Sequence, residues 1–194
     1  MSDMLVKLYD LPDVASLVKR LTDQGIIIRT AMAYEKHHVV EWVRGSFGEG
    51  WASECDVAFS NHPVSCLIAT EGGHIIGFGC YHSTCRNFFG PTGVAETKRG
   101  LGIGKALFLS CLHAMAAEGY AYAIIGGVGP GDFYARTAGA TTIEGSSPGI
   151  YRDPLTKQES QPYASRVRVK APPPKHGVQR MKGTTNDPIP AHAD

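Results

Sequence analysis

The chain has 194 residues, a formal net charge of +1 and an apolar fraction of 43 %. A charge this close to zero gives no global attraction to nucleic acid or to a membrane surface, and no apolar run is long enough to span a bilayer. The first residues also lack the pattern of a secretory signal, so we expect a cytoplasmic protein with one domain and a sizeable core.

The five cysteines are odd in number, and none belongs to a Cys-x-x-Cys pair. Three of them lie in apolar stretches. This usage is typical of reduced thiols in the core of a cytoplasmic protein, so we expect neither disulfides nor a zinc site.

Apolar periodicity and turn residues predict the elements of the first half of the chain. Pro12 near a first turn and Gly25 at the end bound a predicted helix. A β-branched run follows, and Gly72-Gly73 forms the centre of a hairpin. The predicted elements are a helix over 11–24, a strand over 26–32, helices over 35–47 and 51–59, and hairpin strands over 65–70 and 75–82.

The second half of the chain alternates strands with helices. Its longest helix has apolar or small residues at helical spacing on one face and ends at Gly119. The predicted elements are a strand over 88–95, a helix over 102–118, a strand over 120–126, a helix over 132–138, and strands over 141–144 and 149–152. This order predicts a three-layer α/β domain on a mixed sheet, without internal repeats.

A glycine-rich turn joins the strand that ends at Val94 to the long helix. Its glycines let the backbone approach a ligand closely, and the unpaired N–H groups of the helix start favour an anion. A P-loop does not fit, because Arg99 stands at its first glycine and Ala106 at its hydroxyl position. The dinucleotide pattern G-x-G-x-x-G does not fit either.

The spacing that does fit is Arg-x-x-Gly-x-Gly, formed by Arg99, Gly102 and Gly104 after the hydrophobic strand. With this motif the chain resembles the GNAT superfamily of acyl-CoA-dependent N-acetyltransferases over roughly residues 25–153. The resemblance implies the GNAT fold, a three-layer α/β/α arrangement around a mixed, mostly antiparallel sheet. We expect this domain to span 1–164, including an N-terminal helical extension. A tight turn with glycines used only for packing is the alternative interpretation.

The resemblance also implies acetyl-CoA as cosubstrate and no metal. In the family this loop holds the pyrophosphate of coenzyme A, and the preceding strand pairs with the pantetheine arm. A backbone N–H at Thr92 or Val94 is expected to face the acetyl carbonyl. The residues expected to bind the cosubstrate are Thr92, Gly93, Val94, Arg99, Gly100, Leu101, Gly102, Ile103, Gly104 and Lys105. Family members often form homodimers, so a homodimer is expected here as well.

Tyr134 is the candidate general acid. It lies in a segment that resembles the family's Phe-Tyr-x-x-x-Gly helix near the coenzyme A sulfur, with one extra residue before Gly139. A phenol with a pKa near 10 is a suitable proton donor to a departing thiolate. A tyrosine packed on the core is the alternative interpretation.

The general base cannot be read from the sequence. Four side chains are candidates, and a chain of water molecules is an alternative; the four are Glu35, His82, Asp132 and Glu144. The acceptor is expected to be a primary amine of unidentified structure. Five aromatic residues are candidates for lining its pocket, although aromatics near a sheet more often belong to the core; they are Phe78, Tyr81, Phe88, Phe89 and Tyr151.

The expected function is therefore transfer of an acetyl group from acetyl-CoA to a primary amine. A non-catalytic acyl-CoA-binding sensor of the same fold is the alternative. Residues 165–194 are basic and rich in proline, which predicts an extended or disordered tail. No aromatic residues alternate with its charges, so we do not expect nucleic-acid binding through it.

Overall fold

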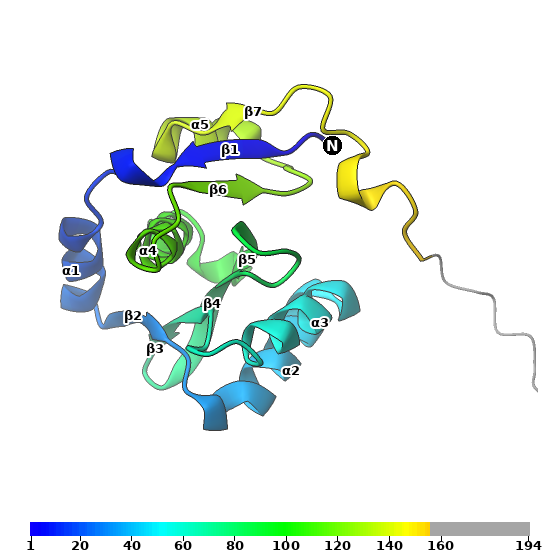
Figure 1. The fold of residues 1–194 in the computed structure, drawn as a ribbon. Helices are drawn as coiled ribbons and strands as arrows, with labels where there is room; N and C mark the ends of the chain where they lie inside the picture. Colours follow the sequence, from blue (N-terminus) through cyan, green and yellow to red (C-terminus); the bar gives the residue numbers. More distant parts are fainter. Residues whose placement is uncertain (156–194) are drawn as a thin grey trace, which may run out of the picture. The chain divides into compact units, whose positions relative to one another are not determined.

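Seven strands form one mixed sheet in the order β2-β3-β4-β5-β6-β1-β7, in a computed structural model that describes residues 1–155 (Figure 1). All neighbouring pairs are antiparallel except β5 and β6, which are parallel. The strands are β1 (Met4–Lys7), β2 (Ile26–Thr30), β3 (Cys66–Glu71), β4 (His74–Tyr81), β5 (Phe88–Val94), β6 (Tyr122–Ile125) and β7 (Thr141–Thr142). The predicted fold class is confirmed.

Helices cover both faces of the central strands and create two separate cores. The helices are α1 (Ala15–Asp23), α2 (Lys36–Phe47), α3 (Glu49–Ala58), α4 (Ile103–Ala117) and α5 (Gly131–Ala138). Along β3, Cys66 and Ile68 join the core under α2 and α3, whereas Leu67 and Ala69 join the core under α1 and α4. This alternation is the two-residue period of a strand that is buried on both faces.

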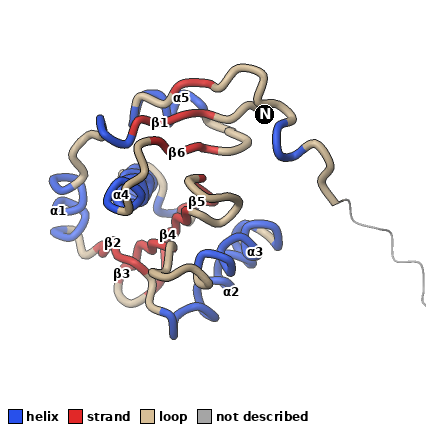
Figure 2. The backbone as a smooth tube through the Cα atoms, in the orientation of Figure 1, coloured by secondary structure: helices blue, strands red, loops and turns tan. Residues whose placement is uncertain are grey.

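The longest helix, α4, lies inside a curve of the sheet, with β6 and β1 on one side and β3 and β4 on the other (Figure 2). Two glycines of β4 allow this close packing. A Cβ on Gly77 would lie 3.1 Å from Leu107 Cδ1, and a Cβ on Gly79 would lie 3.3 Å from Cys111 Sγ. Between them, Phe78 points to the opposite core and is fully buried. The glycines therefore fix how closely α4 approaches β4.

The parallel strands β5 and β6 pair over only a short distance. Their register joins Phe88 to Ile124 and Phe89 to Ile125, where β6 ends. The chain then turns away at Gly127, whose φ of +56° favours glycine. Strand β5 continues to Val94 without a partner on this side. One edge of a central strand is thus left open, an exception to the usual coverage of sheet edges.

One prediction about the ends of the sheet was wrong, and one strand was not predicted. Residues 149–152 were expected to form a strand, but Gly149–Tyr151 form a 3₁₀ turn, which begins after Pro148 with a φ of +57° at Gly149. Strand β1 was not expected at all, yet it pairs with both β6 and β7. The expected strand over 141–144 is limited to β7. The other predicted helices and strands occur within a few residues of their predicted limits.

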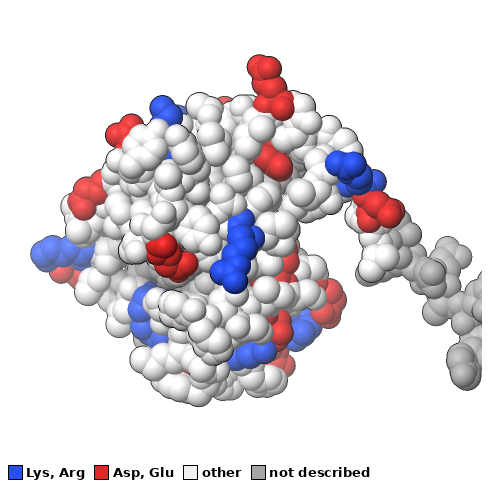
Figure 3. Space-filling view, in the orientation of Figure 1, with Lys and Arg blue, Asp and Glu red and all other residues white. Residues whose placement is uncertain are grey.

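The predicted basic tail over 165–194 lies outside the described residues. Within residues 1–155, none of the helices combines the length and the apolar character that crossing a bilayer requires. Figure 3 shows acidic and basic side chains interspersed over the visible face, in keeping with the net charge of +1.

Candidate functional site

A cavity of about 1280 Å³ opens where β5 and β6 part. It is larger than most small-molecule sites, which span roughly 300–1,000 Å³. Its walls come from both faces of the sheet: α4 and the glycine turn on one face, α2 and α3 on the other. Residues 126–130 after β6 form the far side of the gap. The cavity therefore passes through the sheet at its break.

The open edge of β5 presents backbone donors to this cavity. The N–H of Ala95 donates to the Ile76 carbonyl of β4 at 2.9 Å. Because N–H groups alternate in direction along a strand, those of Thr92 and Val94 are directed away from β4, toward the unpaired edge. Pro91, in the same strand, has no N–H group and therefore offers no donor. Two backbone donors thus line the gap at the predicted positions.

The glycine turn and the start of α4 present a second set of donors. Gly100 and Gly102 have φ values of +85° and +91°, which favour glycine. The first helical hydrogen bond of α4 runs from the Ala106 N–H to the Gly102 carbonyl at 3.0 Å. The N–H groups of residues 103–105 have no partner within the helix, and the helix dipole adds positive potential there. This is the geometry of an anion site.

Three basic side chains line the cavity at the same end: Lys98, Arg99 and Lys105. Arg99 Nε donates to the Val94 carbonyl at 3.4 Å, and its guanidinium lies 3.6 Å from a Glu96 carboxylate oxygen. The Arg99 side chain remains 60 % exposed, so this ion pair is weak and leaves donors free for a ligand. Lys98 pairs with Glu71.

Tyr134 reaches the cavity from α5 and is only 8 % exposed. Its ring packs edge-on against Phe108 of α4, with ring centres 5.1 Å apart, and against Phe89 of β5 at 6.3 Å. Burial raises the pKa of the Tyr134 phenol, so the proton stays bound throughout the neutral range. The position and the protonation state both suit a proton donor.

Two of the four candidate bases are held by hydrogen bonds outside the cavity. Glu35 accepts two hydrogen bonds from Arg29, at 2.6 and 2.7 Å, and a third from the Met32 N–H. These bonds to Arg29 and the backbone lower the pKa of Glu35 to about 2, far too low for a base. His82 Nε2 lies 3.1 Å from Glu118, and its Nδ1 accepts the Asn87 N–H at 2.9 Å. Both residues stabilise the fold.

The other two candidates, Asp132 and Glu144, are exposed and do not line the cavity. Asp132 lies in the first turn of α5, and Glu144 follows β7. None of the four candidate bases lines this cavity, so none of them is placed to accept a proton from a molecule bound in it.

A carboxylate that the sequence did not single out does line the cavity. Glu54 of α3 accepts a hydrogen bond from the Thr84 hydroxyl of the β4–β5 loop. No other carboxylate among the described residues belongs to the cavity wall. Beside it, Phe47 and Trp51 are stacked, with ring centres 5.3 Å apart and planes at 28°. No sequence motif marks these residues, because only the fold brings them together at the cavity.

The predicted aromatic lining is correct for two of the five residues. Phe89 and Tyr151 line the cavity. Phe78 and Tyr81 are buried in the core, and the Phe88 ring packs beside Gly126. All predicted cosubstrate residues and Tyr134 line the same cavity except Leu101, which is 45 % exposed and points elsewhere.

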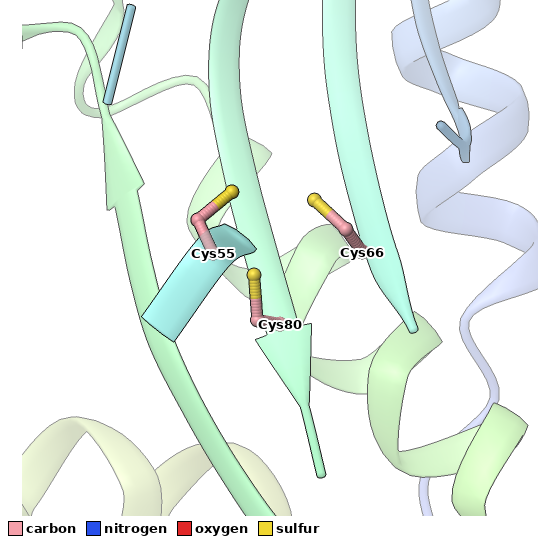
Figure 4. A group of neighbouring side chains, drawn as sticks. All are labelled: Cys55, Cys66 and Cys80. Atoms are coloured by element: carbon pink, nitrogen blue, oxygen red, sulfur yellow. The ribbon is translucent and has the colours of Figure 1, made fainter. Parts of the chain in front are cut away.

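Three cysteines form a cluster outside the cavity. Cys55 of α3, Cys66 of β3 and Cys80 of β4 turn their sulfur atoms toward one another within 4.8 Å (Figure 4). All three are fully buried, and burial raises the pKa of the Cys80 thiol. A structural zinc site takes four protein ligands, and no fourth His, Cys, Asp or Glu ligand completes this group in residues 1–155. All five cysteines are free thiols.

Comparison with known proteins decides the family. Residues 32–138, more than half of the chain, match the model of the Acetyltransferase (GNAT) family. The chain belongs to the GNAT acetyltransferase family. The cavity of this GNAT domain lies between β5 and β6, and both strands fall within the matched segment. Tyr134 lies near the end of that segment. No curated protein matches the sequence.

Solved structures share the GNAT fold with this chain. A GCN5-related glucosamine N-acetyltransferase region of a fungal multi-domain GH3 β-N-acetylglucosaminidase superposes with a TM-score of 0.61 at 17 % identity, covering 73 % of this chain and 19 % of the other. GCN5-related N-acetyltransferases from Sphaerobacter thermophilus and Kribbella flavida give TM-scores of 0.54 and 0.51 at 20 % and 16 % identity. Each covers 73 % of this chain, and 48 % and 53 % of the other chains. This GNAT chain thus spans about half or less of their lengths, and the likeness shows the fold alone.

Proposed function

We propose that this GNAT protein transfers an acetyl group from acetyl-CoA to a primary amine. The observation that carries the proposal is the cavity through the broken sheet, which brings together an anion site, an open strand edge and a buried phenol. These three features match the phosphate, the amide-rich arm and the thioester of the donor.

The donor's charged and amide groups fit the residues present. The N–H groups at the start of α4, with Arg99 and Lys105 beside them, suit the pyrophosphate. The open edge of β5 suits the amides of the pantetheine arm, because an unpaired strand edge accepts an extended chain in the way it accepts another strand. The N–H of Thr92 or Val94 suits the thioester carbonyl, whose oxygen gains negative charge when the amine attacks.

The proposed acetyl transfer releases one proton overall. An amine with a pKa near 10 is about 99.9 % protonated at pH 7, so it first loses a proton before its lone pair attacks the thioester carbon. The carbon–sulfur bond then breaks, and the Tyr134 phenol donates its proton to the departing thiolate. The amide nitrogen loses a second proton, and the phenol regains one. The nitrogen thus loses two protons and the sulfur gains one.

A screen of amines tests the proposal. Acetyl-CoA is incubated with the full chain and with polyamines, amino sugars, amino acids, aminoglycosides and peptides, and free thiol is followed over time. We expect at least one amine to release thiol and to yield its N-acetyl product. Tight acetyl-CoA binding without acetylation of any amine would instead favour the sensor function, and no binding of acetyl-CoA would overturn both.

A further inference from the structure

The cavity has two ends of different chemical character, and they lie on opposite faces of the sheet. The three basic side chains that line it belong to the turn and the start of α4. The wall on the other face comes from α2 and α3, and it carries the single carboxylate of the lining, Glu54. A molecule with an anionic end and a cationic end is complementary to this distribution of charge.

Aromatic rings line the cavity together with this carboxylate. Phe47 and Trp51 are stacked on one another, and Trp51 remains 39 % exposed. Tyr151 reaches the cavity from the 3₁₀ turn, where its Oη would lie 2.5 Å from a Cβ on Gly126. Tyr151 and Glu54 line the same cavity, and burial and then the negative charge of Glu54 raise the pKa of Tyr151. Aromatic faces attract organic cations and apolar groups alike.

Glu54 is fixed in this wall rather than free in solvent. Its Oε1 accepts the hydroxyl of Thr84, a residue of the β4–β5 loop that also lines the cavity. No basic side chain is paired with Glu54 among the described residues. Its second oxygen and most of its charge are therefore available to a donor from a ligand. A partly buried carboxylate without a cationic partner is complementary to an ammonium group.

We propose that this wall is the acceptor subsite and that Glu54 holds the ammonium group of a primary amine carried on an aromatic or alkyl body. This inference rests on the proposed acetyl transfer and narrows its acceptor class. Amines that carry a carboxylate or phosphate near the nitrogen are disfavoured, because their anion would lie beside Glu54. The acceptor's apolar body packs against Phe47, Trp51 and Tyr151.

The experiment uses the full chain saturated with acetyl-CoA and three probes that share one phenylethyl body. 2-Phenylethylamine carries the expected features, and phenylalanine adds a carboxylate to it. N,N-Dimethyl-2-phenylethylamine is a cation at neutral pH and keeps one N–H donor, but it cannot form an amide. Glu54→Gln removes the charge and keeps an oxygen for Thr84. Glu49→Gln on the same helix is the matched control, because Glu49 pairs with Arg44 outside the cavity lining.

The expected result is weaker binding of the dimethylated cation to Glu54→Gln by about tenfold or more, measured by calorimetry. The KM for 2-phenylethylamine should rise similarly, while acetyl-CoA affinity and the Glu49→Gln protein stay unchanged. Wild type should also prefer 2-phenylethylamine to phenylalanine. Equal cation binding by wild type and Glu54→Gln, no cation binding by wild type, or a preference for phenylalanine would overturn the inference. Each of these results is distinct from a loss of acetyl-CoA binding, which would overturn the proposed function itself.

Discussion

The ring of Phe47 lies directly against the backbone of Gly93. A Cβ placed on Gly93 would be 2.5 Å from Phe47 Cζ and under 3 Å from two further ring atoms. Gly93 belongs to β5, next to the donors at the open edge, and Phe47 ends α2. This contact joins β5, the strand expected to bind the cosubstrate, to the wall of the cavity on the opposite face. A substitution at Gly93 is therefore expected to move the Phe47 ring.

Gly93→Ala is expected to destabilise the protein and to disturb acceptor turnover. The new methyl group forces the Phe47 ring away from β5, and overpacking of this kind costs about 1–3 kcal/mol. The midpoint of urea unfolding measures the loss of stability. Adding Phe47→Leu should recover part of it, because the smaller side chain leaves room for the methyl group. Gly45→Ala in α2 faces open space and should not destabilise the protein. A Gly93→Ala protein as stable as wild type would contradict this contact.

Gly102→Ala is expected to weaken acetyl-CoA binding, and Gly102→Glu to abolish it. Gly102 has a φ of +91°, and its Cβ would lie 3.3 Å from Leu17 Cδ1, so even alanine shifts the start of α4. Glutamate also adds a negative charge beside the anion site. Gly119→Ala is the control for strain alone, because its φ is +93° in open space at the other end of α4. Calorimetry should show lost affinity for the Gly102 variants only; equal losses at both glycines would argue against the loop assignment.

Arg99→Ala is expected to lower acetyl-CoA affinity by about 1–3 kcal/mol, the range for a hydrogen bond to a charged group. The exposed Arg99 side chain has only weak partners in the free protein, so little stability should be lost with it. Arg136→Ala on α5 is the matched control, since Arg136 is exposed and does not line the cavity. An Arg99→Ala protein that binds acetyl-CoA like wild type would remove this residue from the site.

Tyr134→Phe is expected to slow turnover about 10²–10⁴-fold while acetyl-CoA affinity changes little, because the proton matters only as the carbon–sulfur bond breaks. Burial raises the pKa of this phenol, so wild-type activity should persist through neutral pH and fall only at strongly alkaline pH. That alkaline limb should change in the variant. Turnover at the wild-type rate, with chemistry shown to be rate-limiting, would make Tyr134 a packing residue.

Glu35→Gln is expected to reduce stability by about 1 kcal/mol at neutral pH, because both members of the Arg29 pair are partly exposed. The pKa of Glu35 falls from 4.5 in the unfolded chain to about 2 in the folded protein. Its contribution is therefore complete above pH 4.5 and disappears as the pH falls toward 2. The stability difference between wild type and variant, measured by urea unfolding, should shrink over this range. Glu49→Gln, which breaks a more exposed pair with Arg44, should have a smaller effect.

The sequence predicted the glycine turn and its surroundings well, because their geometry is local. Gly102 and Gly104 stand at fixed spacing from Arg99, and the α4 periodicity extends directly from them. Tyr134 was found through a second local segment. Strand β1 was missed because only Met4 and Val6 face the core, and two residues are too few for a periodic signal.

The acceptor wall could not be predicted for a different reason. Glu54 lies on a helix whose periodicity indicates only which side is buried, and its neighbours in the cavity come from distant segments such as Thr84 and Tyr151. The base candidates illustrate the same point: His82 lies beside Glu118 at the end of α4, 36 residues away in the sequence. Side-chain partners depend on tertiary structure, which spacing along the chain does not encode.

The pairing of strand β1 has a consequence for the way the protein is made. Met4 pairs with Ile125 and Thr142, so β1 can pair only after more than a hundred further residues have been synthesised. The nascent chain must hold residues 4–7 without their partners while more than a hundred further residues emerge. Contacts of such long sequence separation form slowly, and an unpaired apolar strand is prone to association with other chains. We expect fusions that occlude the N-terminus to lower the soluble yield more than equal fusions placed after residue 155.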